Sequence, residues 1–88
     1  MSQYDKRLER LCRRPPPTDL RWDEFVAILG SLGFVLHERS GGSSHKYLVA
    51  TVTGQERRID TSRPHPGGIM KQYQLRETVA KLHEWGLL

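Results

Sequence analysis

The sequence predicts a small α+β domain in which one helix is followed by three antiparallel strands and a second helix. Two segments, one early and one at the end, carry apolar residues at helical spacing. The chain between them is rich in β-favouring residues and is interrupted by glycine-containing turns. Each helix has a single apolar stripe, so both helices are expected to bury that stripe on the same face of the sheet. A chain of 88 residues has room for one such domain.

The first helix of this domain is expected over residues 20–32. Thr18 and Asp19 are both plausible N-caps, because their side-chain oxygens can accept from the free amides of the first turn. Gly33 is a natural left-handed stop. The apolar face consists of residues at helical spacing: Trp22, Phe25, Val26, Leu29 and Leu32.

The three strands are expected in the middle of the chain. The first spans Phe34–Arg39, where alternation makes His37 a surface residue. The second runs from His45 to Thr53, and it turns back at Gly54-Gln55 into a third strand over 56–60. The second strand should have two distinct faces: Leu48, Ala50 and Val52 on one side, and Tyr47, Val49 and Thr51 on the other. Short connections make all three strands antiparallel neighbours.

The final helix is expected from Met70 to Trp85, after a loop over 61–68 that contains Arg63 and His65. Its buried stripe consists of three residues: Leu75, Val79 and Leu82. Gly86 should end the helix. Lys71 lies in the first turn, where the helix dipole disfavours a cation, and a residue placed against local preference hints at a function.

Residues 1–17 form a basic N-terminal arm with a proline linker, and the domain proper covers residues 18–88. Leu8 and Leu11 are three positions apart, so a short amphipathic helix is possible before Pro15–Pro17 stops it. Two interpretations are open. The arm is either an appendage on a stiff linker that adds positive charge for a phosphate backbone, or a solvated helix that packs on the domain.

The composition narrows the classes of function. The net charge of +4 favours an anionic partner, with nucleic acid first. A single cysteine, Cys12, excludes a disulfide framework and fits the cytoplasm. No apolar run is long enough to span a membrane, and no signal-peptide core is present. We expect no cofactor and no metal site, because the histidines show no paired ligand spacing: His37, His45, His65 and His83.

The candidate site is the small-residue loop that opens onto the second strand and delivers His45. An imidazole titrates near pH 6.5, so His45 is a candidate general acid or base at neutral pH. The loop leaves room for a phosphate, to which serine hydroxyls and backbone amides can donate. Candidate residues for binding RNA phosphates are Arg39, Gly42, Ser43, Ser44, Lys46, Arg63 and Lys71. His65 is a candidate for a second proton transfer, or it is a structural loop residue between two prolines.

Four collinear stretches resemble the HicA-type toxins, the mRNA-cleaving partners of bacterial type II toxin–antitoxin modules. They are Leu29–Phe34, Gly41–Tyr47, Arg63–Pro66, and Lys71–Arg76 leading into the final helix and its Gly86-Leu87 ending. The resemblance implies a fold like the double-stranded RNA-binding domain, a catalytic histidine at His45 and a HicB-type antitoxin as partner. Two features depart from the family pattern: the arm that precedes the first helix, and Pro64 directly before His65.

Three functions are compatible with these features. The first is a metal-independent endoribonuclease toxin, in which RNA cleavage persists in EDTA and is lost in His45→Ala. The second is a non-catalytic RNA-binding module of the same fold, whose salt-dependent RNA binding survives that substitution. The third is a small interaction protein that only binds an antitoxin-like partner.

Overall fold

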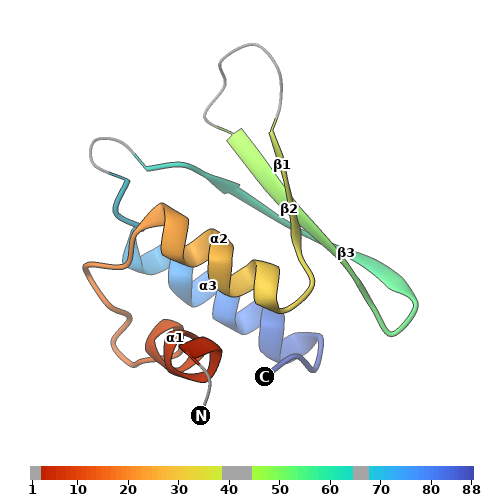
Figure 1. Cartoon of the computed structure of the whole chain (residues 1–88), viewed down its shortest axis with the longest axis horizontal. Helices are drawn as coiled ribbons and strands as arrows, with labels where there is room; N and C mark the ends of the chain where they lie inside the picture. The colour runs from red at the N-terminus through yellow and green to blue at the C-terminus, as the bar shows by residue number, and fades with distance from the viewer. Residues whose placement is uncertain (1–2, 39–44, 65–67) are drawn as a thin grey trace.

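The computed structural model describes residues 3–38, 45–64 and 68–88, and for residues 3–5 and 45 it describes the backbone. Its elements are α1 (Gln3–Leu11), α2 (Trp22–Ser31), β1 (Val35–Glu38), β2 (His45–Val52), β3 (Gln55–Ser62) and α3 (Gln72–Glu84) (Figure 1). From α2 onward the order is α-β-β-β-α, as predicted and as in the double-stranded RNA-binding domain. No helix in these ranges is long and apolar enough to cross a membrane.

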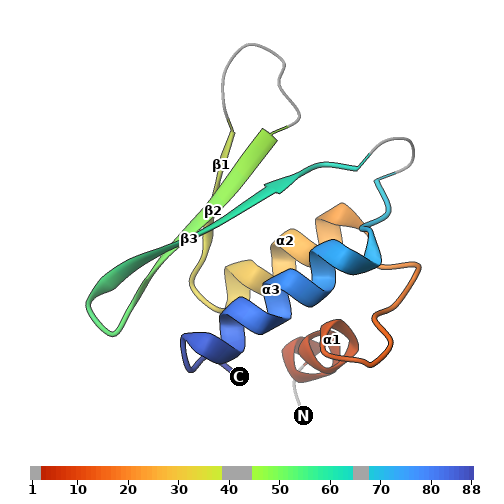
Figure 2. The ribbon, with the colours of Figure 1, turned by 180° about the vertical axis from the view of Figure 1, so that it is seen from behind.

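The elements form three layers. Both views show α2 and α3 side by side against one face of the sheet, while α1 lies beyond the helix pair, away from the sheet (Figures 1 and 2). The prediction that both helices of the domain share one sheet face is therefore confirmed. None of the helices that the structure describes lies on the opposite face of the sheet (Figure 2).

The sheet has the order β1-β2-β3, with both pairs antiparallel. Leu36, Leu48 and Ile59 are opposite one another across the three strands, and Leu48 and Ile59 are buried. Val49, the residue of β2 after Leu48, lies on the other face of the sheet, which we call the open face. Its register partners there are Val35 in β1 and Arg58 in β3. Val35 is 60% exposed there, so the predicted alternation between a buried face and an open face is confirmed.

The core lies between the sheet and the helix pair. α2 ends at Gly33, whose φ of 98° is the left-handed conformation predicted for it, and the next amide, of Phe34, donates to the Leu29 carbonyl at 3.0 Å. This hydrogen bond turns the chain back after α2, so that Phe34 is buried and β1 begins at the next residue. The largest fully buried side chains are Leu11, Leu20, Phe25, Ile28, Leu29, Leu48, Ile59, Met70, Leu75 and Leu82.

The predicted N-caps Thr18 and Asp19 are wrong, because α2 begins later, with Arg21 as its N-cap. The chain before the helix instead pairs with the segment that leads into α3. Trp22 N–H donates to the Gly68 carbonyl at 2.7 Å, and Met70 N–H donates to the Leu20 carbonyl at 2.8 Å. These backbone groups are committed to a strand-like bridge, so α2 starts at Trp22 and α3 starts at Gln72 rather than at Met70.

The β2–β3 turn lies one residue earlier than predicted. Its two central residues are Thr53 and Gly54, with φ of 49° and 79°. Positive φ at both central positions is the type I′ geometry, whose twist matches that of the flanking strands. Starting one residue earlier, β3 also runs on to Ser62, past the predicted end at residue 60.

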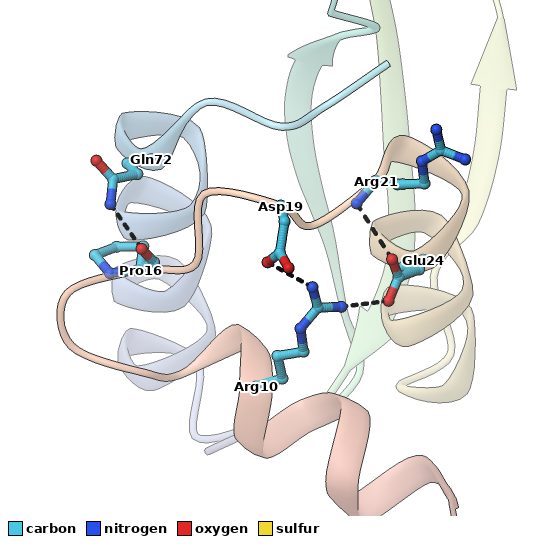
Figure 3. A network of polar contacts seen from close by, with 6 residues as sticks. All are labelled: Arg10, Pro16, Asp19, Arg21, Glu24 and Gln72. Carbon is cyan, nitrogen blue, oxygen red and sulfur yellow. Dashed lines mark hydrogen bonds and ion pairs between the residues drawn. The ribbon is translucent and has the colours of Figure 1, made fainter. Parts of the chain in front are cut away.

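The arm packs on the domain, as in the second of the two interpretations. Its helix α1 contacts α2, and Leu11 is 1% exposed. Arg10 donates to Asp19 Oδ1 at 2.6 Å and to Glu24 Oε2 at 2.5 Å, and Gln72 Nε2 donates to the Pro16 carbonyl at 2.7 Å (Figure 3). Asp19, predicted to cap α2, thus holds the arm instead. The hydrogen bond to Asp19 raises the pKa of the Arg10 guanidinium above its ordinary value.

Candidate functional site

His45 is the first residue of β2, at the end of the sheet where the β1–β2 connection enters. In the β2–β3 register it is opposite Ser62, the last residue of β3. The next residue along the chain is Arg63, which is exposed. The register therefore brings the backbone of Arg63 to the same end of the sheet as that of His45.

A buried glutamine connects this sheet end to the start of α3. Gln74 is 8% exposed, and its Nε2 donates to the Ser62 carbonyl at 3.2 Å. Its Oε1 accepts from the backbone N–H of Lys71, the N-cap of α3, at 3.1 Å. Lys71 is exposed, so one side-chain amide holds a cationic residue beside the strand position opposite His45. Gln74 was not predicted as a site residue, because a glutamine in a first helical turn carries no signal of a contact with a distant strand.

The same capping arrangement recurs at α2, where the Arg21 N–H donates to Glu24 Oε1 at 3.5 Å. A capping box normally has a second bond, in which the N-cap side chain accepts from the third helical amide. Arginine and lysine side chains have no acceptor atom, so Arg21 and Lys71 can form only one half of the box. Both helices thus begin with an exposed cation at the N-cap.

A small pocket of about 180 Å³ lies where these segments meet. It is lined by Arg63, Arg21, Trp22, Asp23 and Gly68. Arg63 was predicted from the sequence, whereas Arg21 was not singled out, because it precedes a helix far away in the chain. The bridge between Arg21 and Ile69 holds residues 68–70, a few positions after Arg63, against the entrance to α2. Two guanidinium groups at the amino end of a helix form a suitable environment for a phosphate.

Lys46 is engaged in an ion pair. Its Nζ lies 3.5 Å from Glu38 Oε1, and its side chain is 12% exposed. The two residues are also opposite each other in the β1–β2 register, so the pair joins the strands at the end where β2 begins. A phosphate at Lys46 would compete with Glu38 for the ammonium group.

The remaining predicted site residues lie outside the described part of the chain. These are Arg39, Gly42, Ser43 and Ser44, which precede β2, and His65, which follows β3. Their proposed roles stay predictions. Within the described ranges, no group of three histidine, cysteine or acidic side chains is arranged to hold a metal ion.

The open face of the sheet carries an aromatic and cationic stack that was not predicted from the sequence. The His37 and Tyr47 rings stack at 4.9 Å between centroids with an interplanar angle of 6°. The Arg58 guanidinium carbon lies 4.0 Å from the Tyr47 ring centroid, and the guanidinium also pairs with Asp60 at 2.8 Å. The prediction of His37 as a surface residue is confirmed, and the stack gives it a packing role on this face.

Comparison with known proteins gives one family match. A family model described as the HicA toxin of bacterial toxin–antitoxin systems matches residues 22–83, which span α2 through most of α3. No curated protein and no solved structure gives a match. The arm, with α1 and the proline linker, lies outside the matched segment.

Proposed function

Because this chain belongs to the HicA toxin family of bacterial toxin–antitoxin systems, we propose that it is a metal-independent endoribonuclease that cleaves mRNA. His45 is the catalytic residue and acts as a general acid or base. An antitoxin protein of the HicB type binds the toxin and blocks its site. The arm adds to this core but supplies none of the proposed catalytic groups.

The observation that carries the proposal is the meeting of three segments at one end of the sheet. His45 is opposite Ser62, Arg63 follows Ser62, and Gln74 connects Ser62 to the cap residue Lys71. A histidine backbone position and two exposed cationic residues are therefore grouped, although they come from β2, the loop after β3 and the start of α3. This grouping supports binding of a ribose-phosphate beside the imidazole.

The chemistry requires no metal. The 2′-hydroxyl of RNA attacks the adjacent phosphorus, a cyclic 2′,3′-phosphate forms, and the bond to the 5′-oxygen of the next nucleotide breaks. A base must take the proton of the 2′-hydroxyl, and an acid must protonate the departing 5′-oxygen. His45 supplies one of these transfers, and His65 is the candidate for the other. The phosphorane carries extra negative charge, which Arg63 and Lys71 stabilise.

The pocket formed by Arg21 and Arg63 suits a neighbouring phosphate of the same strand. Its volume of about 180 Å³ and its two guanidinium groups fit an anion rather than a base, although Asp23 at its wall limits the net positive charge. Such a contact carries little sequence information, because every nucleotide has the same phosphate. It would hold the RNA while the scissile phosphate lies at His45.

The test is a cleavage assay with the full chain and an mRNA transcript in excess EDTA. We expect cleavage, with 2′,3′-cyclic phosphate and 5′-hydroxyl ends on the products. Salt-dependent RNA binding without cleavage would instead identify a non-catalytic RNA-binding module of the same fold. Binding to the antitoxin with neither RNA binding nor cleavage would identify a small interaction protein. Cleavage that requires an added divalent ion would contradict the proposed mechanism.

A further inference from the structure

A groove of about 400 Å³ lies between the arm and α3. The helix of the arm, α1, lies on the side of the helix pair that faces away from the sheet (Figures 1 and 2). We call this groove the arm groove. One wall is the end of α1 with the proline linker, and the other is a single stripe of α3. It is lined by Leu11, Cys12, Arg13, Arg14, Pro15 and Pro16 from the arm, and by Arg76, Val79, Ala80 and His83 from α3.

Contacts near both ends of the groove-lining segment of the arm, residues 11–16, hold the groove open. Arg10 binds Asp19 and Glu24, and the Pro16 carbonyl accepts from Gln72 at the start of α3 (Figure 3). Between these points Leu11 is 1% exposed and anchors the end of α1 in the core. The groove is therefore built into the folded chain, and a ligand need not order the arm to enter it.

The groove combines an apolar lining with a cationic rim. Val79 and Ala80 contribute aliphatic surface, Pro15 extends it along the linker, and the buried residues Leu11 and Pro16 complete the lining. Arg13, Arg14 and Arg76 are exposed. Among the side chains that the structure describes, no carboxylate lies within ion-pair distance of any of these three arginines, whereas Arg10 has two such partners and Arg58 has one.

We propose that the arm groove binds an acidic amphipathic segment of the antitoxin, an inference that rests on the proposed toxin function. Aliphatic side chains of that segment would fill the lining, and its carboxylates would pair with Arg13, Arg14 and Arg76. Peptides commonly bind to grooves in this way, with apolar side chains as anchors and charged residues at the rim.

Nucleic acid fits the groove less well than an acidic amphipathic peptide does. Binding of single-stranded RNA relies on aromatic side chains that stack on bases, and among the described side chains the lining contains no phenylalanine, tyrosine or tryptophan. A phosphate backbone would use the arginines but would leave the aliphatic lining without a partner. The arm, which forms one wall of the groove, also lies on the other side of the helix pair from the sheet, and β2 of that sheet begins with His45 (Figure 2). A partner segment there would add affinity and selectivity to an antitoxin that also covers the RNA site.

The test is direct binding of the purified antitoxin to the full chain, with RNA cleavage measured in parallel. Arg13→Glu/Arg14→Glu reverses two charges on the rim. Lys6→Glu/Arg7→Glu is the matched control, because it makes the same charge change at two exposed arm residues that do not line the groove. A third variant, Ala80→Gln, lengthens a side chain in the lining without changing charge. We expect the rim and lining variants to weaken antitoxin binding by about tenfold or more, and the control by less than about threefold.

Amide exchange gives an independent readout. Bound antitoxin should slow exchange at residues 76–83 of wild type, and this protection should be lost in Arg13→Glu/Arg14→Glu. Unchanged antitoxin affinity in the rim and lining variants, equal weakening by rim and control variants, or no antitoxin binding at all would overturn the inference. Weaker binding of a single-stranded RNA oligonucleotide, with antitoxin binding intact, would make the groove an RNA site and would overturn it too. Failure of the proposed function has a different signature, because the wild-type chain would then not cleave RNA in the absence of antitoxin.

Discussion

The side-chain amide of Gln74 donates to the backbone carbonyl of Ser62 at 3.2 Å, and this bond fixes the start of α3 against the end of β3. Because Ser62 is the register partner of His45, the bond also sets the position of α3 relative to the proposed catalytic strand. A polar side chain that is 8% exposed and bonded through both its nitrogen and its oxygen is costly to remove.

Gln74→Ala should therefore lower both stability and activity. The substitution leaves the Ser62 carbonyl and the Lys71 N–H without their partner, and we expect a loss of about 1–3 kcal/mol in the free energy of unfolding. Urea denaturation measures this loss. At a temperature where the variant is fully folded, its RNA cleavage rate should still be below that of wild type, because Lys71 is no longer held beside the sheet end.

Gln72→Ala is the matched control for this prediction. It removes the same side chain two positions earlier in α3, but the bond that it breaks goes to Pro16 of the linker. Its cleavage rate should stay close to that of wild type. Equal losses of cleavage in the two variants would show that Gln74 has no special part in arranging the site.

Arg10→Ala should loosen the arm while leaving the domain folded. Arg10 bonds two carboxylates that are partly or largely exposed, with side-chain exposures of 36% for Glu24 and 78% for Asp19, so solvent screening keeps each pair weak. We expect the free energy of opening of α1 to fall by about 1 kcal/mol, with a smaller effect at high salt. Amide exchange of α1 measures it directly, and Arg10→Lys should recover part of the loss.

The pKa of Arg10 gives this prediction a pH dependence with a definite sign. Its pKa is raised in the folded chain, so the stabilisation is complete below the ordinary pKa of an arginine and is lost only as the pH rises above it. The difference between wild type and Arg10→Ala should therefore persist to about pH 10. A difference that vanished between neutral pH and that value would contradict the assignment of Arg10 as the charged partner.

Thr53→Asn should stabilise the protein. Thr53 is a β-branched residue at a φ of 49°, and among the described residues it is the only non-glycine with positive φ. Asparagine tolerates this conformation better, and Asn-Gly is the preferred pair for a type I′ turn. We expect a gain of about 0.5–1 kcal/mol, measured by urea denaturation, with unchanged RNA cleavage. A loss of stability would mean that the turn is not of this type in solution.

Cys12 should react slowly with alkylating reagents in the folded chain. Burial raises the pKa of its thiol, so less thiolate is present at a given pH. Its alkylation rate by iodoacetamide should rise at a higher pH than that of a free cysteine, and urea should remove the difference. Because the unfolded thiol ionises first, this group also lowers stability as the pH rises above its unfolded pKa. Fast alkylation of the folded chain near neutral pH would contradict the burial of Cys12.

The sequence was sufficient to predict the order of elements and the two faces of the sheet. Leu48 and Ile59 are buried, and Val35 is exposed. Side chains alternate between the two faces of a strand with a period of two, and this alternation can be recognised in the sequence itself. Gly33 and Gly86 end their helices with positive φ, which is also a local property. These features depend on neighbours in sequence.

Apart from the one-residue shift of the β2–β3 turn, the errors arose where distant segments meet. Thr18 and Asp19 have the side chains of N-caps, but the bridge between Leu20–Trp22 and Gly68–Met70 moves the start of α2, and Asp19 bonds Arg10 instead. In the same way, nothing in the local pattern around Gln74 indicates that it reaches Ser62. Arg21 and Arg63 share a pocket beside that bridge, although they are far apart in the chain. Such contacts are set by tertiary packing, on which local propensity has little influence.

The central claim is that the imidazole of His45 performs a proton transfer in RNA cleavage. The most direct measurement is the single-turnover cleavage rate of His45→Ala in excess EDTA, compared with wild type and with His83→Ala. His83 is exposed on α3 at the arm groove, so its removal controls for the loss of a histidine elsewhere. We predict that His45→Ala retains its fold and its RNA binding but cleaves at least about 100-fold more slowly, while His83→Ala cleaves like wild type. A folded His45→Ala that cleaves at the wild-type rate would contradict this account.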